Sequence, residues 1–282
     1  MRQLSSSDER SPEDSSATCV RILWTGGWDS TFRVLYVSLI DGKQVEPHYI
    51  VDTGRPSTLR ELQAISEIKD LLRTSYKQAH NRISNLQMTL VNEIPEDIAI
   101  TNSFERLKQR AFLGDQYNWL ARYAKSRNLT DLELSVHIDD RAYSFLKGKV
   151  EQTPSGGYRL NQRVTGDENI FARFEFPMLE YSKTHMRDIA RKHGFIEILE
   201  KSWFCHHPMN GIPCGMCNPC AFTVEEGLRY RLPREALFRY HTRRYREAMK
   251  ALKAPFRFAR KSLSEVKILR QAYDFLRYGS KS

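Results

Sequence analysis

The sequence predicts an α/β fold, a parallel sheet with helices on both faces. Short apolar segments alternate with segments of helical periodicity over residues 19–200, and this β-α-β order is typical of parallel sheets. Polar or glycine-containing loops follow three of the predicted strands, at the sheet edge where such folds bind ligands. A four-cysteine metal-binding segment and a helical C-terminal extension are expected to follow the sheet.

The elements are predicted from apolar spacing and from turn residues. The first predicted strand is a short apolar run over residues 19–24, and further strands are predicted over residues 45–51, 86–91 and 132–138. A helix is expected between the first two strands, ending near Asp41, and further helices over residues 58–72, 106–126, 183–193, 224–245 and 262–278. The polar segment 147–170 is predicted to be a loop or a small hairpin.

Four segments are expected along the 282 residues. Residues 1–18 are rich in serine and acidic side chains and are predicted to be a disordered leader. The sheet domain covers residues 19–200, the cysteine segment residues 201–227, and the basic helical extension residues 228–282.

Composition excludes a membrane protein. The mean hydropathy is −0.56, and no apolar run approaches the ~20 residues that a membrane span requires. The N-terminal residues contain no apolar segment of the signal-peptide type. We therefore expect a cytoplasmic protein that does not contact membranes.

The positive charge is confined to one end of the chain. The net charge is +10, but residues 228–282 alone carry 16 Lys and Arg against 4 Asp and Glu, so the preceding residues are slightly acidic. Aromatic side chains interleave with these basic residues. Such a mixture suits a nucleic acid or an acidic protein partner, and equally suits amphipathic helices that pack on the body of the protein.

A loop typical of phosphate binding follows the first strand. It reads Thr25-Gly26-Gly27-Trp28-Asp29-Ser30 and leads into a helix. The glycines allow close approach to a ligand, and the helix start offers N–H groups and a positive dipole end. The Thr25 and Ser30 hydroxyls can donate to phosphate oxygens, while Asp29 suggests a bridging Mg²⁺. The alternative is a tight turn that binds nothing.

Four of the five cysteines lie close together in the sequence, at Cys205, Cys214, Cys217 and Cys220. Four thiolates suit a closed, tetrahedral Zn²⁺ site with a structural role. An iron–sulfur cluster and free cysteines are the alternatives. Because no secretion signal is evident, disulfides are a poor default.

The phosphate loop resembles the SGGxDS signature of the PP-loop ATP pyrophosphatases, with Thr25 in place of the first serine. The resemblance implies an adenine nucleotide alpha hydrolase-like fold and ATP cleavage to AMP and pyrophosphate. Members of this superfamily adenylate a carboxylate or carbonyl oxygen, and a nitrogen or sulfur nucleophile then displaces AMP. Thr25, Gly26, Gly27, Asp29, Ser30 and Asp52 are the implied cofactor-binding residues, with ATP and Mg²⁺ as the cofactors.

The cysteine segment extends the resemblance to the 7-cyano-7-deazaguanine synthases, which end in a similar CGxCxxC cluster. Cys214–Cys220 match that pattern, and Pro177, Leu179 and Lys183 resemble the family's proline–leucine–lysine segment. The implied activity is AMP-forming ligation of ammonia to a 7-carboxy-7-deazaguanine carboxylate, followed by nitrile formation. The family's substrate segment is not recognisable after His137, and residues 55–57 also depart from the family pattern.

Two further sets of site residues follow from these patterns. Asp29, Lys183 and Arg110 are the candidate catalytic residues, although Lys183 and Arg110 could also be a solvated lysine and a salt-bridged arginine. His137 and Asp139 lie at the end of a predicted strand and are candidate substrate-binding residues, with a purely structural histidine as the alternative.

Three other functions stay open. An amine on a protein partner could capture the acyl-adenylate, the basic extension could guide a nucleic-acid modification enzyme, or the chain could be a zinc-stabilised scaffold that binds ATP without turnover. A homodimer is also possible.

Overall fold

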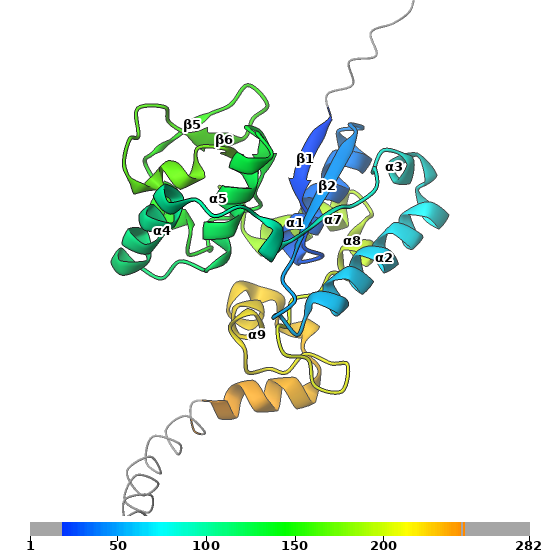
Figure 1. Cartoon of the computed structure of the whole chain (residues 1–282). Coiled ribbons are helices and arrows are strands. Elements are labelled where there is room, and N and C mark those ends of the chain that lie inside the picture. The colour runs from blue at the N-terminus through cyan, green and yellow to red at the C-terminus, as the bar shows by residue number, and fades with distance from the viewer. Residues whose placement is uncertain (1–18, 244, 246–282) are drawn as a thin grey trace, which may run out of the picture.

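The computed structural model describes residues 19–243 and 245. Its centre is a seven-stranded sheet in the order β3-β2-β1-β4-β7-β6-β5 (Figure 1). The first five strands in this order run parallel, and the β5–β6 hairpin adds two antiparallel strands at one edge. The strands are β1 (Val20–Leu23), β2 (Val45–Val51), β3 (Gln87–Leu90), β4 (Leu132–Glu133), β5 (Val150–Gln152), β6 (Tyr158–Leu160) and β7 (Phe174–Glu175).

The helices connect these strands and follow the last of them. The α-helices are α1 (Trp28–Leu35), α2 (Thr58–Ser75), α3 (Lys77–Asn81), α4 (Ile98–Arg110), α5 (Gln116–Ser126), α6 (Tyr143–Leu146), α7 (Lys183–Lys192), α8 (Ile196–Leu199) and α9 (Asn218–Thr223). Short 3₁₀ or π segments are η1 (Tyr36–Ile40), η2 (Val91–Glu93), η3 (Asp167–Phe171), η4 (Val224–Leu228) and η5 (Arg229–Arg231). Residues 234–243 are also helical.

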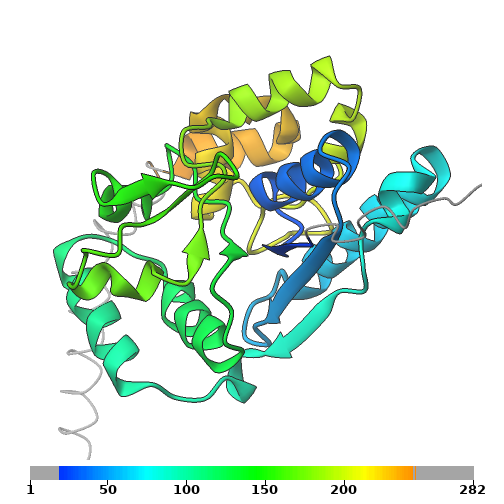
Figure 2. The same cartoon turned by 90° about the horizontal axis from the view of Figure 1, so that it is seen from above.

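Helices cover both faces of the sheet because consecutive side chains of a strand point to opposite faces. Ile22 and Trp24 pack in one apolar cluster with side chains of α1, α2, α7 and α8. Leu23 and Ile50 pack in the other cluster, with side chains of α4 and α5. The view from above shows these two groups of helices on opposite sides of the strands (Figure 2). The predicted fold class is confirmed.

The predicted helix over residues 106–126 is wrong in its extent. The chain forms two helices, α4 and α5, separated by residues 111–115. Ala111 is fully extended at the end of α4, and Leu113 turns inward to lie 1 % exposed in the core. Gly114 follows, and Asp115 is the N-cap residue of the second helix. The apolar spacing continues across this break, so periodicity alone merges the two helices.

Two other predictions need correction. The predicted strand 132–138 pairs as a strand only at Leu132–Glu133, and beyond Leu134 the chain leaves the sheet in a tight turn, in which Val136 N donates to Leu134 O. The predicted helix over residues 224–245 is interrupted at Gly227, where φ is +84°, and again before Pro233, because proline cannot donate the next helical hydrogen bond. The predicted leader and the helix over residues 262–278 lie outside the described residues.

The order of the strands creates a crevice next to β1. The chain runs from β1 to β2 and β3 on one side, and then crosses to β4 and β7 on the other. β1 and β4 share a single register pair, Ile22 with Glu133, so the two strands separate at their carboxyl ends. Ligand sites of open α/β sheets lie at such a switch point. Within the described residues, no helix has the length and apolar character needed to span a bilayer.

A buried ion pair joins the two halves of the sheet beside this crevice. Arg33 on α1 donates Nε–H and Nη2–H to the two carboxylate oxygens of Glu133 on β4, each at 2.7 Å. The side chains are 14 % and 5 % exposed. Removing one partner from such a pair leaves the other charge buried and unpaired. This lowers the free energy of unfolding by several kcal/mol.

We therefore expect Glu133→Gln to lower the free energy of unfolding by about 3 kcal/mol, because Arg33 loses its hydrogen-bonded carboxylate and keeps only the longer 3.7 Å pair with Asp41. Urea titration followed by circular dichroism measures this. The matched control is Asp70→Asn, since the Asp70–Arg73 pair is more than 60 % exposed on both sides and should contribute less than about 1 kcal/mol. Equal effects of the two substitutions would contradict the role given to Glu133.

Candidate functional site

The loop after β1 is held by a close backbone approach at Gly26. Gly26 has φ of +69°, and a Cβ atom placed there would lie 2.8 Å from the main-chain oxygen of Glu61 on α2. Its own carbonyl accepts a hydrogen bond from Trp203 N at 2.7 Å. The loop is thus fixed between α2 and the segment that leads into the cysteines, and only glycine fits this position.

Two hydroxyl groups line the inner side of this loop. Ser30 Oγ accepts a hydrogen bond from Thr25 N at 3.2 Å and lies 3.2 Å from Thr25 Oγ1. Helix α1 begins at Trp28 with Gly27 as its N-cap, and no side chain of the described residues caps it. The first N–H groups of a helix have no partner within the helix, so this end of α1 is suited to an anion.

Asp29 is the centre of a cluster of charged side chains drawn from four segments. Its Oδ2 lies 3.7 Å from Lys183 Nζ on α7 and 3.8 Å from His137 Nε2, beyond β4. Lys183 Nζ also lies 2.6 Å from Glu226 Oε2 on η4. His137 Nδ1 accepts a hydrogen bond from Asp139 N at 3.3 Å. The second oxygen of Asp29, Oδ1, is buried and makes no hydrogen bond with any described residue.

The protonation behaviour of this cluster follows from burial and from mutual charge. Burial lowers the pKa of Lys183, but the Asp29 and Glu226 carboxylates outweigh burial, and the pKa of the ammonium group rises. Burial raises the pKa of the Glu226 carboxyl and of the nearby Asp140 carboxyl. Lys183 is therefore a fixed cation, while the two carboxyls are shifted toward accepting protons.

Most of the residues singled out from the sequence line one cavity of about 820 Å³ at the crevice between β1 and β4. The predicted residues in its lining are Thr25, Gly27, Asp29, Ser30, Asp52, His137, Asp139 and Lys183. Gly26 does not line the cavity, and it packs against the main chain of Glu61. Asp52 follows β2 and accepts a hydrogen bond from Gly54 N at Oδ1. The structure brings together side chains that are more than 150 positions apart in the sequence.

Arg110 lies elsewhere. It is the last residue of α4, outside the cavity lining, where its guanidinium pairs with Asp167 at 2.9 Å and with Glu168 at 3.0 Å. Arg106 pairs with the same Asp167 carboxylate. The structure thus places Arg110 in an ion-pair cluster between α4 and η3, the salt-bridged alternative considered for this residue.

A second cavity of about 830 Å³ adjoins the first. The two share Phe112, Asp139, Asp140, Arg141, Phe222 and Glu226 in their linings. Asp140 accepts hydrogen bonds at Oδ1 from Ala142 N at 2.8 Å and from the Tyr117 hydroxyl at 3.4 Å. We refer below to the cavity at the phosphate loop as the loop cavity and to the second as the acidic chamber.

Aromatic and arginine side chains form another wall of the loop cavity. The guanidinium of Arg231 lies over the Trp28 ring at 4.8 Å and over the Phe204 ring at 5.1 Å, while Trp203 and Phe204 stack with ring centres 6.1 Å apart. Arg231 also donates to the carbonyls of Glu200 and Ser202. The first residues of the basic extension therefore form part of the site.

Sequence reasoning missed Glu226, Asp140 and Arg231 as site residues. Glu226 lies on an irregular segment that was predicted to be a regular helix. Arg231 belongs to the basic extension, which was predicted to be separate from the site because of its charge. Asp140 lies beside Asp139, in a loop that was expected at the ligand edge, so the position of that loop was the available signal.

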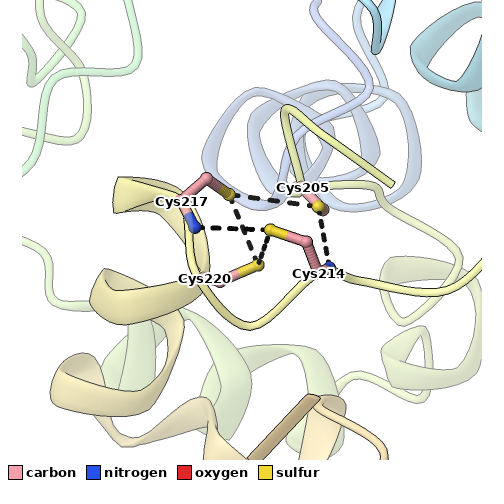
Figure 3. A group of neighbouring side chains, drawn as sticks. All are labelled: Cys205, Cys214, Cys217 and Cys220. Atoms are coloured by element: carbon pink, nitrogen blue, oxygen red, sulfur yellow. Dashed lines mark hydrogen bonds between the residues drawn. The ribbon is translucent and has the colours of Figure 1, made fainter. Parts of the chain in front are cut away.

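The four clustered cysteines converge on one point (Figure 3). Their sulfur atoms all lie within 4.8 Å of one another, and three of the separations are 3.4, 3.9 and 3.9 Å. Tetrahedral Zn²⁺ with Zn–S bonds of about 2.3 Å needs sulfur separations of about 3.8 Å. The donor set thus fits zinc, and a closed four-thiolate site has a structural role.

Main-chain groups around these cysteines are arranged as for thiolate ligands. Met216 N and Cys217 N each donate to Cys214 Sγ at 3.3 Å, and Gly215 N donates to Cys220 Sγ at 3.3 Å. Hydrogen bonding between Cys217 and the Cys205 and Cys220 sulfurs lowers the pKa of the Cys217 thiol. Cys217 also lines the loop cavity, which places the metal segment directly beside the charged cluster.

The basic extension packs on the cysteine segment. Arg239 Nε donates to Cys214 O at 2.7 Å and its Nη2 donates to Pro213 O at 3.2 Å. Leu232 and Ala236 share an apolar cluster with the cysteines. Gly215 has φ of +73°, and a Cβ atom there would lie only 2.0 Å from Ala236 O. Figure 1 shows the helix that follows α9 beneath the cysteine segment.

The solved structures that match this chain include a 4-thiouridine synthetase in complex with RNA and with bound ATP. It aligns with a TM-score of 0.34 and 16% sequence identity. The alignment covers 80% of this chain and 53% of that chain, so the present chain spans about half the length of the synthetase. No protein-family model matches the sequence, and no curated protein matches it.

Replacing Gly215 with alanine should disrupt the cysteine segment, because the new methyl group collides with the backbone of the 234–243 helix. We expect lower metal content and a melting temperature lower by several degrees. Metal analysis of the purified protein and a thermal scan measure the two effects.

The matched control for this prediction is Gly211→Ala. Gly211 lies in the same segment and has a similar φ of +76°, but nothing lies within 4 Å of its Cβ position. The alanine should therefore destabilise the protein only through its left-handed backbone conformation, by about 1–2 kcal/mol. If Gly211→Ala lost as much metal as Gly215→Ala, the collision with Ala236 would not be the cause.

Proposed function

We propose that this chain is an ATP-dependent, AMP-forming carbon–nitrogen ligase that activates a carboxylate of the 7-carboxy-7-deazaguanine type. The observation that carries the proposal is the loop cavity, in which the phosphate loop, Asp29 and Lys183 meet at the switch point of the sheet. The four-cysteine cluster beside it supports the same reading, since the family that the sequence resembles ends in such a cluster.

ATP would bind with its phosphates on the loop after β1. The start of α1 and the Thr25 and Ser30 hydroxyls supply hydrogen-bond donors, and Gly26 allows the tight turn between α2 and the Trp203 backbone. Asp29, whose Oδ1 lacks a partner among the described residues, is suited to hold Mg²⁺, which would neutralise phosphate charge. Asp52 would contact the nucleotide from the end of β2.

The role of Lys183 follows from its fixed charge. Carboxylate attack on the α-phosphorus of ATP joins two anions and expels pyrophosphate, so a buried cation beside the reacting atoms stabilises the transition state. The acyl-adenylate then reacts with a nitrogen nucleophile, and AMP leaves. In the resembled reaction ammonia is that nucleophile, and a second ATP converts the amide to the nitrile.

The deazapurine would lie toward His137 and Asp139. His137 is 3 % exposed and is oriented by its contacts with Asp29 and Asp139, so it is a rigid wall for a planar ligand. The alternative nucleophile, an amine carried by a larger molecule, is favoured by the acidic chamber described above. Zn²⁺ on the four cysteines would keep the Trp203–Phe204 wall in place.

The chemistry is tested by AMP release in the presence of ATP, 7-carboxy-7-deazaguanine and ammonium. We expect Lys183→Ala to reduce the rate at least about a hundredfold, because the transition state loses its buried cation. Lys192→Ala, at an exposed position of the same helix, is the control and should leave the rate unchanged. AMP release by the wild type that does not exceed the value without the deazapurine carboxylate would exclude the proposed activity.

ATP binding is tested separately at the loop. Gly26→Ala should weaken ATP binding at least tenfold, because the added methyl group meets the Glu61 carbonyl and shifts the loop. Gly148→Ala has a similar φ of +74° with nothing within 4 Å, and isothermal titration should show an unchanged Kd for that variant. Unimpaired binding by Gly26→Ala would place the nucleotide elsewhere.

A further inference from the structure

The acidic chamber is much larger than the nitrogen nucleophile of the resembled reaction. Its volume of about 830 Å³ far exceeds the roughly 30 Å³ that one water-sized molecule occupies. Ammonia would fill only a small part of it. The chamber shares Asp139, Asp140 and Glu226 with the loop cavity, so a molecule bound in it lies beside the charged cluster around Asp29 and Lys183.

The lining of the chamber defines the charge of its ligand. Four acidic residues line it, Asp139, Asp140, Glu225 and Glu226, against Arg141, and Lys183 Nζ lies 2.6 Å from Glu226. The acidic residues still outnumber the cations, and a carboxylate near a protein surface attracts a cation several times more strongly than it does in water. A polyanion such as a nucleic-acid backbone is disfavoured here.

Apolar side chains contribute the second part of the specificity. Phe112 is 64 % exposed and Ile138 is 45 % exposed, and both line the chamber together with Phe222 and Tyr143. Aromatic faces attract ammonium groups, and exposed apolar side chains that gather in a cavity mark a binding surface. The combination suits an ammonium group attached to an aliphatic chain.

We propose that the acidic chamber binds the nitrogen nucleophile of the reaction, a primary amine carried by a larger cationic molecule. The inference rests on the proposed acyl-adenylate chemistry and names the second substrate of the same site. Glu226 lines both cavities, and burial raises the pKa of its carboxyl group, so it is placed to receive a proton from the amine.

The amine enters by ordinary acyl transfer. The ammonium group gives one proton to the Glu226 carboxylate, and the freed lone pair forms the C–N bond at the acyl carbon. The bond from that carbon to the adenylate oxygen breaks, and AMP leaves with the electron pair. The second proton of the nitrogen passes to water, and the product is a substituted amide.

The test compares amines of equal length and different charge. Cadaverine carries a second ammonium group, while 5-aminopentanoate carries a carboxylate in its place. With ATP and 7-carboxy-7-deazaguanine supplied, we expect kcat/KM for cadaverine to exceed that for 5-aminopentanoate about tenfold, with cadaverine incorporated into the product by mass spectrometry. Nα-acetyl-lysine methylamide, added as a third amine, distinguishes a lysine side chain of a protein from a free diamine.

Charge reversal at the rim of the chamber supplies the decisive variant. Glu225 is exposed and lines only the acidic chamber, so Glu225→Lys should abolish or invert the preference for cadaverine. Glu235→Lys makes the same change of net charge at an exposed position of the 234–243 helix, outside both cavities, and should keep the preference of the wild type.

Two outcomes overturn the inference. One is equal kcat/KM for the two amines, and the other is a preference that Glu225→Lys leaves unchanged. If Glu225→Lys instead altered KM for the deazapurine carboxylate and not for the amine, the chamber would bind the deazapurine ring. This result also overturns the inference. Hydroxylamine, a small uncharged nucleophile, distinguishes these failures from failure of the proposed function. Hydroxamate forms whenever the acyl-adenylate forms, so its absence would contradict the proposed function itself.

Discussion

The carbonyl of Gly26 accepts a hydrogen bond from Trp203 N at 2.7 Å, while the space of its missing side chain is filled by the main chain of α2. Three segments that are distant in the sequence meet at this residue: the loop after β1, helix α2, and the segment before Cys205. Backbone atoms cannot rotate out of such a contact. The phosphate loop is therefore positioned by the rest of the fold before any ligand binds, which is the preorganisation that phosphate chemistry requires.

The charged cluster follows from this arrangement. α1 carries Asp29 into the crevice, α7 brings Lys183 from one side, and the chain beyond β4 brings His137 from the other. One cation is shared by Asp29 and Glu226, so the carboxylates outnumber the fixed cation within this cluster. An excess of buried negative charge is costly without a compensating ligand, and Mg²⁺ or a cationic substrate would offset it.

Local features of the site could be predicted from the sequence, and long-range ones could not. The residues of the phosphate loop are contiguous, and the cysteines lie within 16 positions, so spacing alone identified them. The strand limits at 45–51 matched because valines mark both ends of this mostly buried segment. Lys183 was found through a motif resemblance, not through any physical property of its own neighbourhood.

The residues that were missed depend on contacts that no periodicity records. Glu226 reaches the site because Gly227 adopts a left-handed conformation and turns the chain, and Arg231 does so because η5 returns to Trp28. Arg110 was misplaced for a related reason: α4 ends at this residue, and its guanidinium pairs with η3 rather than with groups in the crevice. Charge composition likewise separated residues 228–243 from a body on which they pack.

The single register pair between β1 and β4 has a consequence for how such a protein can diversify. The loops after β1 and β2 line the loop cavity through residues such as Thr25 and Asp52, whereas the acidic chamber is lined by the chain beyond β4 and by residues after β7, such as Ile138 and Ser182. Because so few backbone hydrogen bonds join the two halves of the sheet, the loops of one half can change in length and charge without disturbing the strand pairing of the other. The Thr25–Ser30 loop belongs to the half with β1, β2 and β3, whereas Lys183 and the unrecognisable segment after His137 follow strands of the other half. The two walls of the crevice are thus built on separately paired groups of strands.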